Sequence, residues 1–218
     1  MKRLTITLAF AAALGLASLA TASVLVYQTD FGKKKDVQRV DKLVGGKSCA
    51  KSWKGKSALG FKVKEGRKNC MLQTPVEGDG KQPDHVIVAS AKVLKETSKK
   101  VRADVYAGVA LRANAKSAYE LRIFPKGRRF VLLKNGGEIE EGKADDLNPL
   151  GKRNQLRLEA SGGNITAEVN KKTVATFRDD DPAEVRGRKT ALTFGSDARS
   201  NKDGYGLFAN VKVFVPTP

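Results

Sequence analysis

The stretch AYELRIFPKGRRFVLLK, residues 118–134, decides the fold class. Two short runs rich in alternating, β-branched and aromatic side chains, 118–124 and 129–134, flank Pro125-Lys126-Gly127, a sequence typical of a tight turn. The stretch therefore predicts two antiparallel strands joined as a hairpin.

The same pattern recurs through the chain, and no run of 12 or more residues beyond the N-terminal segment shows the 3.6-residue apolar period of a helix. Further turns are expected at 135–137 and 161–163. Besides the two runs above, we expect strands over 24–31, 58–64, 69–74, 85–94, 101–112, 154–160, 164–169, 173–178, 188–194 and 205–214. This number of strands predicts two packed antiparallel sheets. With no linker and no internal repeat, residues 23–218 are expected to form a single β-sandwich domain.

Residues 1–22 have the features of an export signal. Lys2 and Arg3 precede the apolar run 4–19, and Ala20-Thr21-Ala22 supplies the small residues that signal peptidase requires. An uncleaved membrane anchor is the alternative, because the apolar character continues through 24–27. We expect cleavage after Ala22, and in either case a secreted, periplasmic or cell-envelope domain. In such an oxidising compartment Cys49 and Cys70, the two cysteines of the chain, are expected to form a disulfide.

The chain is strongly basic, with 41 Lys and Arg against 23 Asp and Glu and a formal net charge of +18. This excess is concentrated between residues 33 and 68 and predicts attraction to polyanions that weakens with salt. The candidate contacts are Lys33, Lys34, Lys35, Lys47, Lys51, Lys54 and Lys56. A merely solubilising surface is the alternative. Aromatic residues make up only 6% of the chain, so specific recognition of nucleic acid is not expected.

The C-terminal half resembles the concanavalin A-like lectin and glucanase superfamily, in particular laminin-G-like domains of the 3-keto-disaccharide hydrolase type. The resemblance rests on the order and spacing of five stretches, 108–112, 119–123, 154–158, 165–170 and 206–213, with Gly127 in a turn. It implies a jelly-roll sandwich whose concave sheet carries a carbohydrate site in those relatives that have one. The hairpin usually closed by Asn-Gly instead contains Asn170-Lys171-Lys172.

Alternation along the strands assigns candidate ligand-binding residues. If Val109 and Leu111 face the core, Arg112 faces outward, and in the next strand Glu120 and Arg122 also face outward. Arg112, Glu120 and Arg122 could then hydrogen-bond sugar hydroxyls or a carboxylate, or simply form a surface ion-pair ladder. Trp53, among lysines, could stack on a sugar or belong to the core.

The sequence favours a binding protein, and an enzyme is the alternative. Glycoside hydrolysis requires two suitably spaced carboxylates. The nearest acidic cluster, 138–141, lacks the Asp between spaced Glu residues that β-glucanases of this superfamily show, so no catalytic residue is assigned. If the chain is nevertheless a hydrolase, Glu120 and Glu140 are the carboxylates to test. His85 has no triad partner at an interpretable spacing and is expected to be structural.

No metal or cofactor is expected, although Asp179-Asp180-Asp181-Pro182 could bind Ca²⁺. The sequence thus predicts an exported, non-catalytic module that binds carbohydrate or an anionic envelope polymer. The alternatives are a hydrolase of the 3-keto-disaccharide type and an adhesion protein that binds a protein partner.

Overall fold

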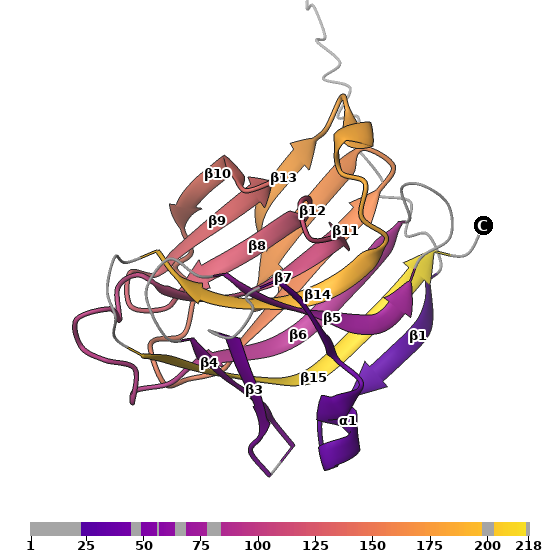
Figure 1. Cartoon of the computed structure of the whole chain (residues 1–218). Coiled ribbons are helices and arrows are strands. Elements are labelled where there is room, and N and C mark those ends of the chain that lie inside the picture. The colour runs from indigo at the N-terminus through magenta and orange to yellow at the C-terminus, as the bar shows by residue number, and fades with distance from the viewer. Residues whose placement is uncertain are drawn as a thin grey trace, which may run out of the picture.

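The protein is an all-β sandwich of two antiparallel sheets (Figure 1). The computed structural model describes residues 23–44, 49–55, 57–63, 69–77, 84–197 and 203–216. The predicted export signal, residues 1–22, lies outside the described residues. No helix in the described part of the chain is long and apolar enough to cross a membrane.

The first sheet contains the N-terminal and C-terminal strands. Its order is β13-β12-β11-β6-β15-β4-β3, with β1 pairing beside β15. The strands are β13 (Lys172–Arg178), β12 (Asn164–Val169), β11 (Asn154–Ser161), β6 (His85–Val93), β15 (Gly204–Pro216), β4 (Leu59–Val63), β3 (Cys49–Trp53) and β1 (Ser23–Thr29).

The second sheet carries the candidate site. Its order is β10-β9-β8-β7-β14-β5-β2. The strands are β10 (Gly137–Lys143), β9 (Arg129–Lys134), β8 (Tyr119–Phe124), β7 (Val105–Ala113), β14 (Lys189–Ser196), β5 (Cys70–Glu77) and β2 (Asp41–Val44). A five-residue helix, α1 (Lys34–Gln38), follows β1, and a 3₁₀ turn, Pro182–Glu184, precedes β14.

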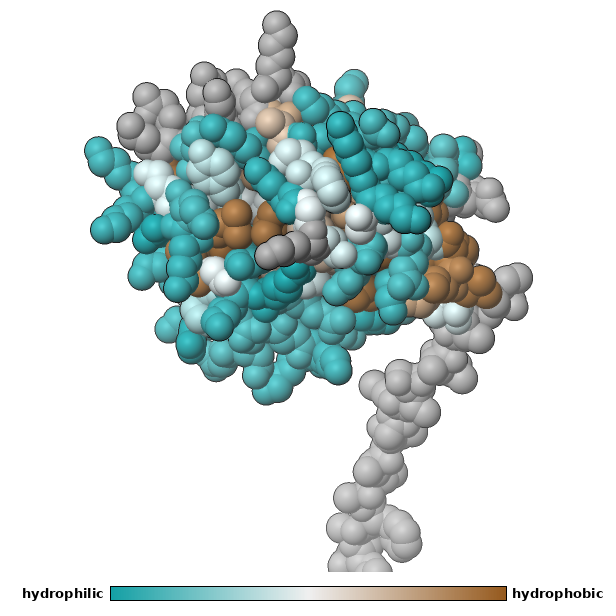
Figure 2. Space-filling model, turned by 90° about the horizontal axis from the view of Figure 1, so that it is seen from below, coloured by the Kyte–Doolittle hydropathy of each residue, from teal (hydrophilic) through white to brown (hydrophobic). Residues whose placement is uncertain are grey.

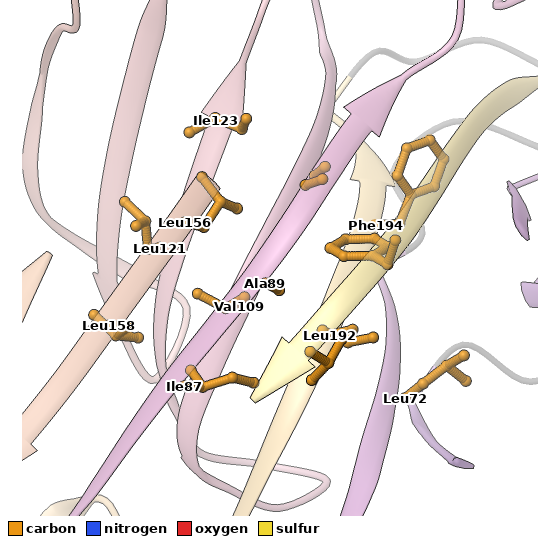
Figure 3. Close-up of a cluster of buried hydrophobic side chains, with 14 of the residues drawn as sticks. Leu72, Ile87, Ala89, Val109, Leu121, Ile123, Leu156, Leu158, Leu192 and Phe194 are labelled. Carbon is orange, nitrogen blue, oxygen red and sulfur yellow. The ribbon is translucent and has the colours of Figure 1, made fainter. Parts of the chain in front are cut away.

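The core lies between the sheets (Figure 3). Ile87 of β6 and Leu156 of β11 come from the first sheet, whereas Val109 of β7, Leu121 of β8 and Leu192 of β14 come from the second. All five side chains are completely buried. In β11, where buried residues alternate with more exposed ones, every second side chain faces the core, as the alternation predicts.

Every predicted strand has a counterpart, although the one predicted over 101–112 begins only at Val105, after a turn at 101–104, and the two-sheet antiparallel jelly roll is confirmed. The hairpin turn at Asn170 keeps the usual geometry although its second position is Lys171, because both residues adopt positive φ, 51° and 71°. The Cys49–Cys70 disulfide is also confirmed, with Cα atoms 5.3 Å apart. Because Cys49 lies in β3 and Cys70 in β5, the bond links the two sheets.

Candidate functional site on the outer face of the second sheet

Glu120 and Arg122 point away from the core, as predicted, and form a bidentate ion pair. The Nε and Nη2 atoms of Arg122 donate hydrogen bonds to the two carboxylate oxygens of Glu120, each at 2.8 Å. Both side chains are largely shielded from solvent, and Glu120 is only 4% exposed. Two parallel hydrogen bonds of this kind fix the orientation of the two charged groups relative to each other.

The guanidinium of Arg122 also contacts an aromatic ring and a second carboxylate. It lies over the ring of Tyr106 in β7, with its central carbon 4.2 Å from the ring centroid. Its Nη1 lies 3.6 Å from Oδ1 of Asp197, which directly follows β14. Arg122 therefore bridges two carboxylates contributed by opposite sides of β7.

The electrostatics of this cluster follow from burial and from Arg122. Burial lowers the pKa of Arg122, but the charge and hydrogen bonds of Glu120 more than offset that effect and leave the pKa above its ordinary value. Burial raises the pKa of Tyr106 well above its ordinary value, so its hydroxyl stays neutral. Partial burial also raises the pKa of Asp197, and Arg122 limits the rise.

These residues line a groove with two adjoining hollows, which we call the outer groove and define by Asn69, Tyr106, Glu120, Arg122 and Asp197. One hollow, of about 390 Å³, lies beside Tyr106, Ser196 and Asp197. The other, of about 160 Å³, lies beside Glu120 and the turn 114–117.

Asn69 and Arg122 line both hollows, so the two hollows are continuous at these side chains. The amide nitrogen of Asn69 also lies 3.5 Å from Oε2 of Glu120. Asn69, Tyr106 and Asp197 were not predicted as site residues. Their proximity depends on the order of the strands, which alternation within a single strand does not reveal.

Arg112 does not join this cluster, and the predicted placement of its side chain is wrong. In β7, Leu111 and Arg112 lie opposite the single residue Thr190 of β14, which is a β-bulge. Arg112 has a positive φ of 47° and is completely buried. Its Nη2 donates to the carbonyl of Gly162 at 2.7 Å and to Asp84 at 3.1 Å, so it connects the second sheet to the first.

The acidic cluster at 138–141 lies on β10, an edge strand of the second sheet. Glu141 pairs with Arg129 at 2.9 Å, and both side chains are about one-third exposed. A bulge between Glu138 and Glu140 interrupts the pairing with β9. These acidic side chains therefore lie along a solvated strand edge and are not arranged as a pair of opposed carboxylates.

Asp179, the first residue of the acidic run 179–181 considered above for Ca²⁺, is engaged in a buried network. It accepts hydrogen bonds from the Tyr119 hydroxyl, from Lys134 at 3.0 Å and from the backbone N–H of Asp181 at 3.0 Å. Asp180 instead faces solvent near Arg178. The described residues contain no group of three or more His, Cys, Asp and Glu side chains that could hold a metal, and the expectation of no metal stays a prediction.

Trp53 lies away from the outer groove, at the end of β3 beside α1. Its indole N–H donates to the carbonyl of Phe31 at 3.0 Å, and the side chain is 44% exposed, so the alternative that places it in the core is wrong. Lys33, Lys34, Lys35 and Lys54 are also exposed, and with Trp53 we call them the basic corner. The structure thus groups Trp53 with the candidate polyanion contacts.

The remaining candidates have other environments. Lys51 extends its amine to the carbonyl of Val40, and Lys47 and Lys56 lie outside the described residues. His85, predicted to be structural, is completely buried at the start of β6.

Seen from below in Figure 2, the side of the molecule that carries α1 and β3 is mostly hydrophilic, with an apolar region at the edge where β1 lies. There Val24, Leu25 and Val26 are between 44% and 52% exposed.

Comparison with known proteins identifies the fold class. No protein-family profile and no curated protein matches the sequence. Among solved structures, a Bacillus subtilis protein of unknown function with a galectin-like fold is similar at a TM-score of 0.62 and 11% identity, over 88% of this chain and 97% of that chain. An endo-1,3-β-glucanase from Streptomyces sioyaensis is similar at a TM-score of 0.62 and 10% identity, over 90% and 97%.

Alginate lyase A1-II′, of polysaccharide lyase family 7, is similar at a TM-score of 0.58 and 10% identity, over 86% of this chain and 99% of that chain. At these identities the likeness defines the fold and nothing finer. The chain therefore shares its jelly-roll sandwich fold with these structures.

Proposed function

We propose that this protein is an exported, non-catalytic module that binds carbohydrate in the outer groove. The observation that carries the proposal is the convergence of Glu120, Arg122 and Asp197, with Asn69 beside them, on one hollowed face of the second sheet. Carboxylate and amide groups held in place by ion pairs suit the hydrogen-bond pattern of sugar hydroxyls. Structures with this fold that act on polysaccharides, such as the glucanase and the lyase, support the same class of ligand.

The geometry favours binding over catalysis. Both oxygens of Glu120 already accept hydrogen bonds from Arg122, which suits orientation of a ligand better than transfer of a proton. A hydrolase of the 3-keto-disaccharide type remains the alternative. It requires that Glu120→Gln or Glu140→Gln abolish turnover while folding and ligand binding persist.

Two features support export. The N-terminal residues have the composition of a signal peptide, and the disulfide between the sheets is typical of proteins in oxidising compartments. The proposal therefore places the domain outside the cytoplasm, with polysaccharide or cell-envelope polymer as its ligand.

A second mode of binding is supported by the basic corner. Trp53 is exposed at the end of β3, where α1 contacts this strand, and the four lysines of the basic corner are exposed as well, an arrangement suited to an anionic envelope polymer. An adhesion protein that binds a protein partner is the third candidate, supported by the exposed apolar residues Val24, Leu25 and Val26 of β1.

A glycan array separates these candidates. The disulfide-bonded domain, residues 23–218, is tested against neutral and acidic glycans at about 0.05 and 0.5 M salt, which changes the screening of charge strongly. Binding of neutral glycans that persists at high salt is the expected result. Binding of acidic polymers alone, lost at high salt, assigns the activity to the basic corner. Absence of binding to every glycan contradicts the carbohydrate proposal and favours a protein partner.

A further inference from the structure

A second cleft, of about 540 Å³, opens at one end of the sandwich. Three connections form its walls: the segment between β6 and β7 with Arg102, the β8–β9 turn with Lys126 and Arg128, and the segment after β10 with Asp145 and Leu150. It shares no lining residue with the outer groove.

Backbone hydrogen bonds hold the walls of this cleft in place. The N–H of Gly127 donates to the carbonyl of Phe124 at 3.0 Å, and the N–H of Ala144 donates to the carbonyl of Arg128 at 2.9 Å. On the opposite side, the N–H of Gly151 donates to the carbonyl of Val93 at 2.9 Å. The connections are therefore tied to strand ends, and the cleft is formed before any ligand binds.

Positive charge surrounds the cleft. Arg102, Lys126, Arg128 and Lys143 line it together with a single carboxylate, that of Asp145. Arg102 is anchored by donating to the carbonyl of Thr97 at 2.8 Å. Lys126, Arg128 and Lys143 are exposed and make no ion pair with any described residue. By contrast, Arg122 and Lys134 elsewhere in the second sheet pair with carboxylates.

The remaining lining residues indicate what kind of anion fits. Pro149 and Leu150 provide apolar surface, against which the faces of sugar rings can pack. Asp145 can accept hydrogen bonds from hydroxyl groups, and the cations can bind carboxylates, Arg128 in bidentate geometry. The volume is within the range of about 300–1,000 Å³ typical of small-molecule sites.

We propose that this cleft binds the carboxylate groups of an acidic oligosaccharide, at a site separate from the outer groove. The choice of a saccharide as ligand rests on the proposed function, whereas the choice of an anion rests on the charge of the cleft itself. The basic corner is the competing location, because it has comparable charge and lies elsewhere on the surface.

Two charge-matched double variants test the location. Lys126→Glu/Lys143→Glu alters the cleft, and Lys34→Glu/Lys35→Glu makes the same change of net charge in the basic corner. All four side chains are exposed, so both variants are expected to fold, as circular dichroism and thermal unfolding can verify. The probe is an oligomer of galacturonic acid, titrated calorimetrically at about 0.15 M salt, with its methyl ester as the uncharged counterpart.

We expect the cleft variant to weaken binding of the oligomer at least tenfold, the basic-corner variant to weaken it less than threefold, and the methyl ester to bind much more weakly. Equal losses in both variants, or a loss confined to the basic-corner variant, would overturn the proposal. Equally tight binding of polyglutamate overturns the saccharide part. If the wild-type domain binds neutral glycans but not the acidic oligomer, the cleft proposal fails while the proposed function of the outer groove stands.

Discussion

At the scale of single residues, the ion pair of Glu120 with Arg122 is expected to stabilise the fold far more than an exposed pair does. Glu120→Gln leaves two buried donors of Arg122 facing a neutral amide, which should lower the free energy of unfolding by about 2–3 kcal/mol. Glu141→Gln is the matched control, because the Arg129–Glu141 pair is partly exposed and is worth at most about 1 kcal/mol. Urea unfolding measures both, and equal losses would contradict the account.

Asp179 should make stability depend on pH. Burial raises the pKa of Asp179, but hydrogen bonds from Tyr119 and Lys134 more than offset this and hold the pKa below its ordinary value. A carboxylate whose pKa is lowered by folding contributes stability above its unfolded pKa, and that contribution is lost as the pH falls through the folded pKa.

Asp179→Asn should therefore lower the free energy of unfolding by about 2 kcal/mol at neutral pH, and the difference from wild type should shrink below a pH of about 4. Urea unfolding across this pH range measures the difference. A difference that stays constant with pH would show that the carboxylate charge is not what stabilises this network.

The same scale shows which site residues can be inferred from sequence. Alternation places Glu120 and Arg122 correctly because both lie in the regular strand β8. It fails for Arg112, because the bulge depends on pairing with β14, about 80 residues further along the chain, and such pairing leaves no local signal. Asp197 was missed for a similar reason, since only the order of the strands brings it to Arg122.

At the scale of elements, the regular strands were predictable, and the elements that were missed are short or lie at edges. The short strands β2 and β3 lie in the lysine-rich segment, and β10 has the acidic sequence GEIEEGK with mostly exposed side chains. Because these strands bury little on either face, they lack the alternation that marks a strand. The helix α1 is only five residues long and buries Val37 alone, so it has almost no apolar period.

The disulfide is the element-scale feature with the largest expected effect on stability. Replacing both cysteines, Cys49→Ala/Cys70→Ala, releases a loop whose ends are 21 residues apart and which joins β3 to β5. Loop-closure entropy predicts a loss of about 3 kcal/mol in the free energy of unfolding. Denaturant unfolding of this variant and of the wild type measures the loss. A change below about 1 kcal/mol would show that the two sheets remain associated equally well without the bond.

At the scale of the whole molecule, the three candidate binding surfaces lie in different places. The outer groove lies on one face of the second sheet, the cationic cleft opens at one end of the sandwich, and the basic corner lies where α1 meets β3. The composition predicts attraction to anions, but it does not locate the contacts. Charges on two of these surfaces act independently when the distance between the surfaces exceeds the screening length, roughly 8 Å at physiological salt.

The measurement that most directly tests the central claim is a titration of the ¹⁵N-labelled domain with a neutral glycan found on the array, followed by NMR at about 0.5 M salt, where nonspecific charge effects are screened. The account predicts that the backbone signals of Asn69, Tyr106 and Asp197 shift, together with the side-chain Nε signal of Arg122, while signals around Trp53 and Lys126 do not. On the outer face of the first sheet, Arg157 of β11 pairs with Glu168 of β12 at 2.8 Å. Shifts confined to that pair or to the basic corner would contradict the claim that the outer groove binds carbohydrate.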